Sequence, residues 1–277
     1  MATINSNAIL KPVVVSEDEK KGWEDKTQRF IGIEIETTRN LNMIPKVDHI
    51  EWNTSAWHMT SSEKEELGKI LDPSEKMIAM IGADGDDIEI ATQPMSLGAL
   101  SYGGESARFF QNINRYCVGL ERSGTHYHVS KKKGDHRNLW RNLYWFSMVF
   151  DKQLYAIFRR RSTWALSPKT IYKERNMKKV DITKPCKDRY PTLGNKGTII
   201  VKRNNTYECR AGAATTSTKE LIAWGKLFYN IVEFCNQKDI VGHRFEEVLP
   251  EGNYGDMLRD RLTGEQQRQI VPIDLYL

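Results

Sequence analysis

The chain has 277 residues, of which 39% are hydrophobic, 10% aromatic and 28% charged, and this supports a soluble protein with a real core in one large or two small domains. The formal net charge of +5 is mild, so it favours anionic ligands slightly and does not by itself indicate nucleic-acid binding.

Neither a membrane segment nor a secretory signal is predicted, because no apolar run could span a bilayer and residues 1–4 lack a basic-then-apolar pattern. The four cysteines are irregularly spaced and contain no C-x-x-C pair, which argues against a zinc ribbon or a disulfide framework. Reduced thiols and a cytoplasmic location are therefore expected. Val13, Val14 and Val15 could add an edge strand, but a solvated charge run follows them, so residues 1–28 are expected to form a flexible N-terminal arm.

Residues 30–38 form the first predicted strand, in which apolar and polar residues alternate. Because successive side chains of a strand point to opposite faces, Glu34 and Glu36 share the polar face, about 7 Å apart. Two carboxylates at this spacing suit a hard cation such as Mg²⁺, which takes carboxylate oxygens together with waters or phosphates. A solvated sheet face has the same pattern, so the metal interpretation depends on matching groups from other segments.

The polar residues 44–76 predict an insertion or lid that contains one short helix. Residues 77–94 then predict a hairpin, because two apolar runs flank an Asp-Gly turn. The acidic residues around this turn are either a polar hairpin tip or further metal ligands, and the sequence leaves both open. They are Asp84, Asp86, Asp87 and Glu89.

A helix is predicted over residues 105–118 and a strand over residues 124–129. His126 and His128 share one face of this strand, a geometry in which both imidazoles can bind a metal or phosphate oxygens. Two surface histidines arranged by chance are the alternative.

The longest helical pattern covers residues 137–160 and runs into three consecutive arginines, Arg159, Arg160 and Arg161. The basic segment that follows, up to residue 194, predicts either a surface loop or a mobile lid that meets an anionic substrate such as ATP or a carboxylate. Arginine suits the second role because its planar fork binds such groups through two hydrogen bonds.

A second hairpin is predicted over residues 197–210, with Glu208 and Arg210 on a shared face. Ser217 and Glu220 then predict a capping box that opens a helix ending near residue 235. The tail has one helical piece near residues 254–270. The predicted catalytic domain covers residues 29–240, and residues 241–277 form a C-terminal extension packed on it.

Together these elements predict an α+β fold with a curved antiparallel sheet, helices packed on one face and an open, charged concave face. Glutamates and histidines clustered on such a face would repel one another or lose hydration unless metals and a ligand fill it. The sequence therefore predicts a metal–phosphate site.

Four motifs occur in a fixed order between residues 30 and 235: Ile-Gly-Ile-Glu-Ile-Glu, Asp-Gly-Asp-Asp-Ile-Glu-Ile, Gly-Thr-His-Tyr-His-Val, and Tyr-Glu-Cys-Arg-Ala-Gly followed by a helix. This order resembles the amidoligase family, within the glutamine synthetase and glutamate–cysteine ligase superfamily of carboxylate–amine ligases. The resemblance implies a glutamine synthetase-like catalytic fold and ATP-dependent amide formation through an acyl phosphate. The chain departs from the pattern at Asp86, where the family has a serine.

The resemblance implies ATP and Mg²⁺ as cofactors, with Mn²⁺ as an alternative, and a carboxylate and an amine as substrates, each from a small molecule, a peptide or a protein side chain. A phage origin is compatible with this resemblance. The metal ligands that it implies are Glu34, Glu36, Glu89, Glu208 and His126. The catalytic residues that it implies are Arg210, which would stabilise the transferring phosphoryl group, Glu36 and Glu208. The residues expected to bind the cofactor are His126, His128, Arg159, Arg161 and Lys202.

Two other function classes stay open, as does the oligomeric state. A non-catalytic protein on the same sheet would bind a peptide or nucleic acid in its groove, although nucleic acid is the less favoured partner. The basic segment 159–189 with its aromatic residues would suit nucleic acid. A metal-dependent phosphoester hydrolase would use the same ligands as the ligase.

Overall fold

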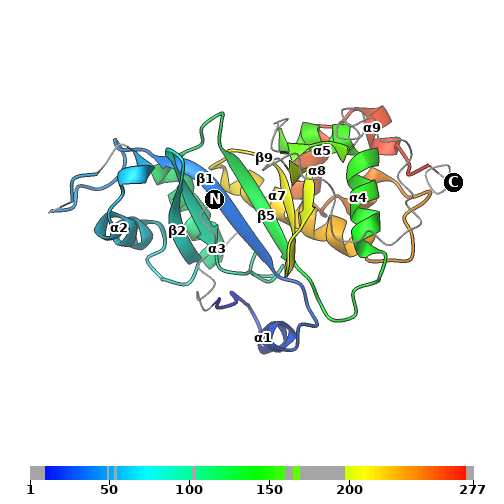
Figure 1. Cartoon of the computed structure of the whole chain (residues 1–277), viewed down its shortest axis with the longest axis horizontal. Helices are drawn as coiled ribbons and strands as arrows, with labels where there is room; N and C mark the ends of the chain where they lie inside the picture. Colours follow the sequence, from blue (N-terminus) through cyan, green and yellow to red (C-terminus); the bar gives the residue numbers. More distant parts are fainter. Residues whose placement is uncertain are drawn as a thin grey trace.

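The computed structural model describes residues 10–48, 50–52, 55–101, 104–159, 165–168 and 197–272. Within these ranges the main element is an open, seven-stranded antiparallel sheet in the order β2-β3-β1-β5-β9-β8, with β4 paired to the end of β1 (Figure 1). This confirms the predicted α+β class and the antiparallel sheet. The strands of the sheet are β1 (Ile31–Arg39), β2 (Ile78–Asp84), β3 (Asp87–Thr92), β4 (Cys117–Val118), β5 (Gly124–Ser130), β8 (Ile200–Lys202) and β9 (Thr206–Ala213). A separate parallel pair consists of β6 (Ala165–Leu166) and β7 (Gly197–Thr198).

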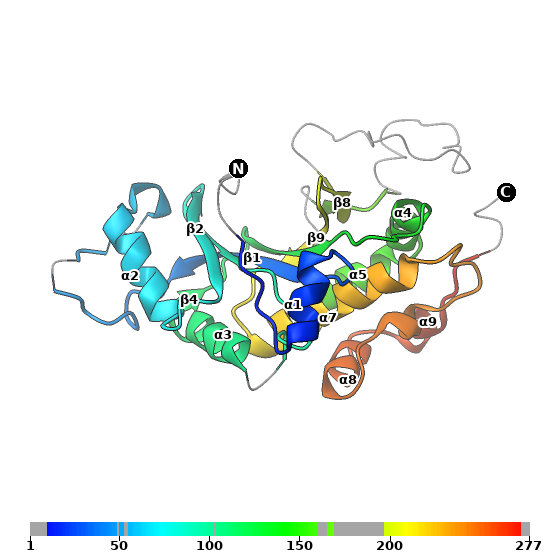
Figure 2. The ribbon, with the colours of Figure 1, turned by 90° about the horizontal axis from the view of Figure 1, so that it is seen from below.

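Helices α3 (Glu105–Tyr116), α5 (Asp151–Phe158) and α7 (Thr218–Cys235) lie along one side of the curved sheet, as Figure 2 shows. Helix α7 is the central one and contacts β1, β5 and β9. The other helices of the described ranges are α1 (Glu17–Glu24), η1 (Ala56–His58), α2 (Ser61–Leu71), α4 (Leu139–Val149), η2 (Phe245–Val248), α8 (Asn253–Arg259) and α9 (Gly264–Arg268). No helix in the described ranges is long and apolar enough to cross a membrane.

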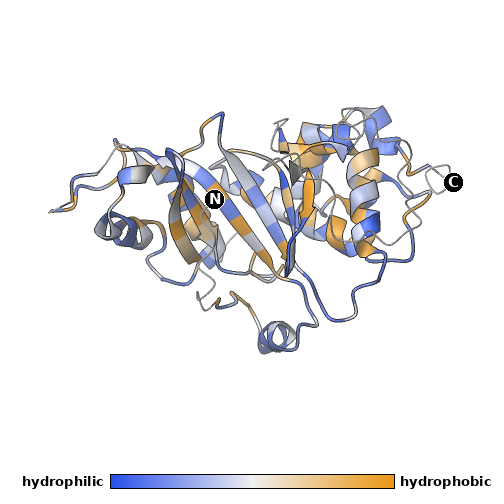
Figure 3. Cartoon of the chain, in the orientation of Figure 1, coloured by the Kyte–Doolittle hydropathy of each residue, from blue (hydrophilic) through white to orange (hydrophobic). Residues whose placement is uncertain are grey.

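Strand β1 alternates in burial along its whole length, and Figure 3 shows the matching alternation of hydrophobic and hydrophilic residues. Ile31, Ile33 and Ile35 are at most 1% exposed and face the helices. Gly225 allows α7 to pack closely on this surface, because a Cβ there would lie 2.8 Å from Leu100 and 3.4 Å from Ile31. The predicted separation of an apolar face from a charged face is therefore confirmed.

The single helix predicted over residues 137–160 is wrong, because the chain leaves helical geometry at Phe150 (φ −104°, ψ 25°) and forms α4 and α5 instead. Phe150 is fully buried and packs against Phe146 and Phe245, with ring centroids 4.8 and 5.4 Å apart. The break lets α4 pack against α7 and β8 while α5 packs against β9.

Residues 10–28 are packed onto the sheet, in contrast to the predicted flexible arm; residues 1–9 lie outside the described ranges. Val13 N–H donates to the Pro94 carbonyl (2.8 Å), and Ser96 N–H donates to the Val13 carbonyl (2.9 Å). Helix α1 follows, with Ser16 as its N-cap. The predicted insertion also belongs to the core, since α2 packs against β2 and α3 and buries Leu67 and Leu71.

Arg29 forms a buried ionic cluster that joins the start of β1, the end of β5 and α7. Its guanidinium donates to both oxygens of Asp135, to Glu233 Oε1 (2.7 Å) and to the Ser130 carbonyl (2.9 Å). The side chain is fully buried. Without it, Asp135 would lose the guanidinium that binds both of its oxygens, and Glu233 would keep only Lys132 as a counter-charge.

Replacing Arg29 with Ala is therefore expected to lower the free energy of unfolding by about 3–5 kcal/mol, as for other buried pairs that lose one partner. Urea unfolding monitored by circular dichroism measures this. Arg259→Ala is the matched control, because its ion pair with Asp256 is exposed and should contribute less than about 1 kcal/mol. Equal stability of the two variants would contradict a structural role for the cluster.

Candidate functional site

The register of the sheet brings the predicted acids and histidines onto one face. Glu34 lies opposite His126 between β1 and β5, and Glu36 lies opposite Glu89 between β1 and β3. His128 in turn lies opposite Glu208 between β5 and β9. Directly opposed residues of an antiparallel pair share a face, so these side chains form one cluster on the side away from α7. We call them the carboxylate–histidine cluster.

His126 lies at the centre of this cluster. Its Nδ1 is 3.4 Å from Glu34 Oε2 and 3.7 Å from Glu208 Oε1, and its Nε2 is 3.7 Å from Glu36 Oε1. His128 contacts the same glutamate from the other side, with Nε2 3.1 Å from Glu34 Oε1. Both imidazoles therefore converge on Glu34.

Glu34, His128 and Glu208 each offer a ligand atom within 4.8 Å of the others, and the described residues contain no other such group. Two carboxylates and one imidazole form a donor set that suits Mn²⁺ and, with waters or phosphates completing the shell, Mg²⁺. The strand pattern left both histidines open as ligands, and the family resemblance implied His126 as the metal ligand; the histidine of this group is His128.

The electrostatics of the cluster keep its central glutamates ionised. Burial alone would raise the pKa of Glu34, but His128 and His126 outweigh it and hold that pKa far below its usual value. For Glu208, burial is likewise outweighed by His128, Arg210 and His126, so its pKa is lowered. The pKa of His128 is raised, because Glu34 and Glu208 overcome the effect of its burial.

Glu89 behaves in the opposite way. Burial first, then the neighbouring charges of Glu34, Asp84 and Glu36, raise its pKa to about 8. Glu36, which lies opposite Glu89 in the sheet, accepts a hydrogen bond from Gly124 N–H through its carboxylate. A cation placed among these carboxylates would remove the repulsion that adds to the effect of burial on Glu89.

The structure distinguishes the four acids of the first hairpin. Glu89 faces Glu36, while Asp87 accepts hydrogen bonds from Ser123 Oγ (2.5 Å) and Arg122 Nη2 (3.1 Å). Asp86 is exposed in the turn, where its carboxylate lies 3.8 Å from Arg122. Of the four, Glu89 is thus the acid that belongs to the cluster, with Asp84 close enough to act on its charge.

The raised pKa of Glu89 predicts a pH-dependent stability in the absence of metal. Its contribution is fully present below the unfolded pKa of about 4.5 and is lost as the pH rises through about 8. Glu89→Gln, which mimics the protonated acid, should lose less stability over this window than the wild type. Urea unfolding at pH 5, 6, 7 and 8 in EDTA measures the difference.

The contribution of His128 is present below pH 6.5 and also falls as the pH rises, but it is common to both proteins and largely cancels in the difference. Parallel stability curves for the wild type and Glu89→Gln would contradict the shifted pKa of Glu89.

Two arginines hold Glu208, and the sequence analysis identified only one of them. Arg210 Nη1 donates to Oε1 (2.8 Å), and Arg203 Nε donates to Oε2. Arg203 N–H bonds to the Thr206 carbonyl across the second hairpin, and residue 201 lies opposite Glu208. Val201 lies opposite Glu208 and therefore shares its face, and Arg203, two residues further along the chain, lies on that face as well. The alternation of side chains in the predicted hairpin could therefore have identified Arg203.

Two of the basic residues predicted to bind the cofactor, Lys202 and Arg159, are described by the structure and do not lie at the cluster. Lys202 lies opposite Tyr207 in the ladder, which places it on the other face of the sheet from Glu208. Arg159 donates to Glu220 (2.7 Å) and lies over the Trp224 ring of α7, 5.5 Å from its centroid. Arg160 and Arg161 lie outside the described residues.

The same contacts explain why the predicted capping box is wrong. Ser217 is the N-cap of α7, but its side chain makes no capping hydrogen bond. The Glu220 carboxylate is bound instead by Arg159, by Arg261 (2.6 Å) and by the Thr215 hydroxyl (2.5 Å). A capping box does form at the start of α2, between Thr60 and Glu63.

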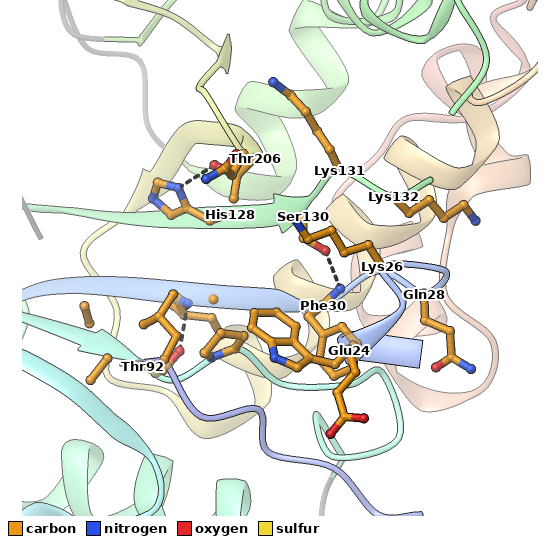
Figure 4. A pocket seen from close by; sticks show the side chains of 18 of the residues that line it. Glu24, Lys26, Gln28, Phe30, Thr92, His128, Ser130, Lys131, Lys132 and Thr206 are labelled. Atoms are coloured by element: carbon orange, nitrogen blue, oxygen red, sulfur yellow. Dashed lines mark hydrogen bonds between the residues drawn. The ribbon is translucent and has the colours of Figure 1, made fainter. Parts of the chain in front are cut away.

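A pocket of about 800 Å³ opens beside the cluster and is lined at one end by Glu34 and His128. Its walls include Trp23 and Phe30, and Gly32 lies between Phe30 and Glu34 on β1. Figure 4 shows His128 and Thr206 on one side of the pocket and Phe30 and Thr92 on the other. Most of the exposed area of the lining is apolar, as is usual for pockets that bind small molecules, although charged and polar residues also contribute to it.

No family model matches the chain, and no curated protein matches its sequence. Similar solved structures include a crystal structure of a novel glutamine synthase homolog and a cryo-EM structure of Plasmodium falciparum glutamine synthetase. Each has 10% sequence identity and a TM-score of 0.36. The matches cover 79% and 81% of this chain, and 57% and 56% of those chains. The chain thus spans little more than half their length, and at this distance the likeness says nothing about its chemistry.

Proposed function

We propose that the protein is an ATP-dependent carboxylate–amine ligase, with a glutamine synthetase-like catalytic fold, that forms an amide bond through an acyl phosphate. The observation that carries the proposal is the cluster itself. Glu34, Glu36, Glu89 and Glu208 converge with two histidines and Arg210 on one sheet face, beside a pocket large enough for a nucleotide. The four sequence motifs supply the strands β1, β3, β5 and β9 that meet there.

Glu34, His128 and Glu208 would hold one divalent cation, and Glu36 and Glu89 offer carboxylates for a second. Such cations, when bound, neutralise the negative charge of the phosphate chain and of the transferring phosphoryl group. Glu208 would exchange at least one arginine contact for the metal. Arg203, whose side chain is 45% exposed against 12% for Arg210, is the one with room to move.

Arg210 is suited to stabilising the transferring phosphoryl group. Its Nη1 is fixed by Glu208, while its Nε is buried and makes no hydrogen bond to the described residues. An unpaired buried donor is costly, and a phosphate oxygen would satisfy it. His128 Nε2 is a second buried nitrogen without a hydrogen bond of good geometry.

In the proposed reaction a substrate carboxylate oxygen attacks the γ-phosphorus of ATP, and the bond to the β-phosphate oxygen breaks to release ADP. The amine then attacks the acyl carbon, inorganic phosphate leaves, and the nitrogen loses a proton. Preorganised charges on a face with little water would favour the first step and protect the acyl phosphate from hydrolysis.

The experiment that tests the proposal is to measure ATP binding by isothermal titration calorimetry with and without Mg²⁺. Binding that requires Mg²⁺ is expected, and its absence would overturn the ligase proposal. Binding with phosphate release that needs no amine would instead indicate a phosphoester hydrolase. Salt-sensitive nucleic-acid binding that survives Glu34→Gln would indicate a non-catalytic groove.

A further inference from the structure

The N-terminal segment of residues 10–28 supplies one side of the pocket that opens from the carboxylate–histidine cluster. Leu10, Trp23 and Lys26 line the pocket from this segment, and Glu34 and His128 line it from the sheet. One pocket therefore joins the proposed metal site to an aromatic residue from outside the sheet.

The segment is attached next to this pocket by specific contacts. Beyond the main-chain bonds of Val13, the Glu19 carboxylate accepts a hydrogen bond from Ser96 Oγ (2.8 Å). Lys133 N–H donates to the Lys26 carbonyl (2.6 Å), which ties the segment to the loop after β5. These contacts hold α1 and the residues that flank it against the loop after β3 and the loop after β5.

Trp23 packs against Phe30 with ring centroids 5.0 Å apart and planes at 75°. In this T-shaped contact the phenyl ring of Phe30 does not cover both faces of the half-buried indole of Trp23. Phe30 in turn precedes Glu34 by four residues of extended chain, a span of roughly 13 Å. This span, from the phenylalanine that Trp23 contacts to Glu34 of the cluster, is long enough for a sugar and a phosphate chain to lie between a base at Trp23 and the cluster.

We propose that Trp23 binds the base of the nucleotide by stacking, which makes the N-terminal segment part of the nucleotide site. The inference rests on the proposed function, because it takes the ligand to be a nucleoside triphosphate. Asp25, Gln28 and Asn205 line the same pocket and carry donors and acceptors that can pair with the edge of a base.

The test compares ATP with inorganic tripolyphosphate, both with Mg²⁺, by titration calorimetry on the full chain. Trp23→Ala should weaken ATP binding by about tenfold to a hundredfold, the usual effect of losing one stacked base, and leave tripolyphosphate binding unchanged. Trp23→Phe, which keeps an aromatic ring, should retain most of the affinity for ATP. Thermal unfolding by circular dichroism checks that each variant folds.

Gly32→Val is a second variant that does not touch Trp23. A Cβ at Gly32 would meet no atom closer than the Thr92 carbonyl oxygen at 3.9 Å, so the strand accepts a side chain that projects toward the pocket. Because Gly32 lies opposite His128, the new side chain should obstruct the metal–phosphate end of the pocket and weaken the binding of ATP and tripolyphosphate alike, in contrast to Trp23→Ala. ATP, but not tripolyphosphate, should also slow tryptic cleavage after Lys20, Lys21 and Lys26.

The inference is overturned if Trp23→Ala binds ATP as the wild type does, or if it loses ATP and tripolyphosphate to the same extent. Equal protection from trypsin by both ligands would also overturn it, while leaving the metal–phosphate site in place. A wild-type protein that binds neither ligand would overturn the proposed function, and the inference with it.

Discussion

Glu34→Gln is expected to reduce Mg²⁺-dependent ATP turnover by about a thousandfold or more. The substitution keeps the size of the side chain but removes the charge on which His126 and His128 converge and which belongs to the candidate metal group. Loss of a correctly held cation removes several kcal/mol of stabilisation from the transition state, and each 1.4 kcal/mol is a factor of about ten in rate. Phosphate release in the presence of ATP, Mg²⁺ and candidate acids and amines measures the effect.

The matched control is Glu65→Gln, which removes a glutamate charge from the exposed surface of α2, where it pairs with Lys69. This variant should keep wild-type turnover, because a surface ion pair contributes little and lies outside the cluster. Both variants should unfold cooperatively by circular dichroism. Wild-type turnover in folded Glu34→Gln would remove Glu34 from the site.

Arg210→Met is the second substitution with a large expected effect, a loss of about a hundredfold to a thousandfold in kcat, the usual result of removing one donor to developing charge. Methionine fills similar volume but leaves Arg203 as the only arginine that contacts Glu208, so stability will also fall. Arg210→Lys separates the two effects, since it keeps a positive charge beside Glu208 but lacks the planar fork.

If Arg210 acts on the transferring phosphoryl group, Arg210→Lys should fold as the wild type does and still show a large loss in kcat with a modest change in the KM for ATP. If its role is only to hold Glu208, Arg210→Lys should recover most of the turnover. Single-turnover measurements of phosphate release distinguish a change in chemistry from a change in binding.

The faces of the strands followed from the sequence because alternation is local. Two residues along a strand always share a face, so Glu34 and Glu36, or His126 and His128, could be placed together without knowing their neighbours. Which strands are neighbours is a long-range property. The pairing of β1 with both β3 and β5 is what brings Glu89 and His126 to either side of β1, and it depends on the packing of the whole sheet.

The failures of prediction are likewise places where tertiary contacts outweigh local pattern. Nothing in the apolar periodicity marks a break at Phe150, because the break is stabilised by Phe245, which lies 95 residues away in sequence. Glu220 has the correct spacing for a capping box, but two arginines bind its carboxylate more strongly than a main-chain N–H would. The charge run of residues 17–21 favoured a flexible arm, but the attachment of residues 10–28 uses main-chain bonds that composition does not reveal.

Crystals grown with Mn²⁺ and a non-hydrolysable ATP analogue, with data collected at the manganese absorption edge, would locate both the metal and the nucleotide. If the cluster is the metal–ATP site, an anomalous peak is expected within coordination distance of Glu34 and Glu208, with phosphate oxygens at the same metal and Arg210 directed toward the γ-phosphate. Nucleotide bound elsewhere, or an occupied pocket with no metal at these two glutamates, would contradict this assignment.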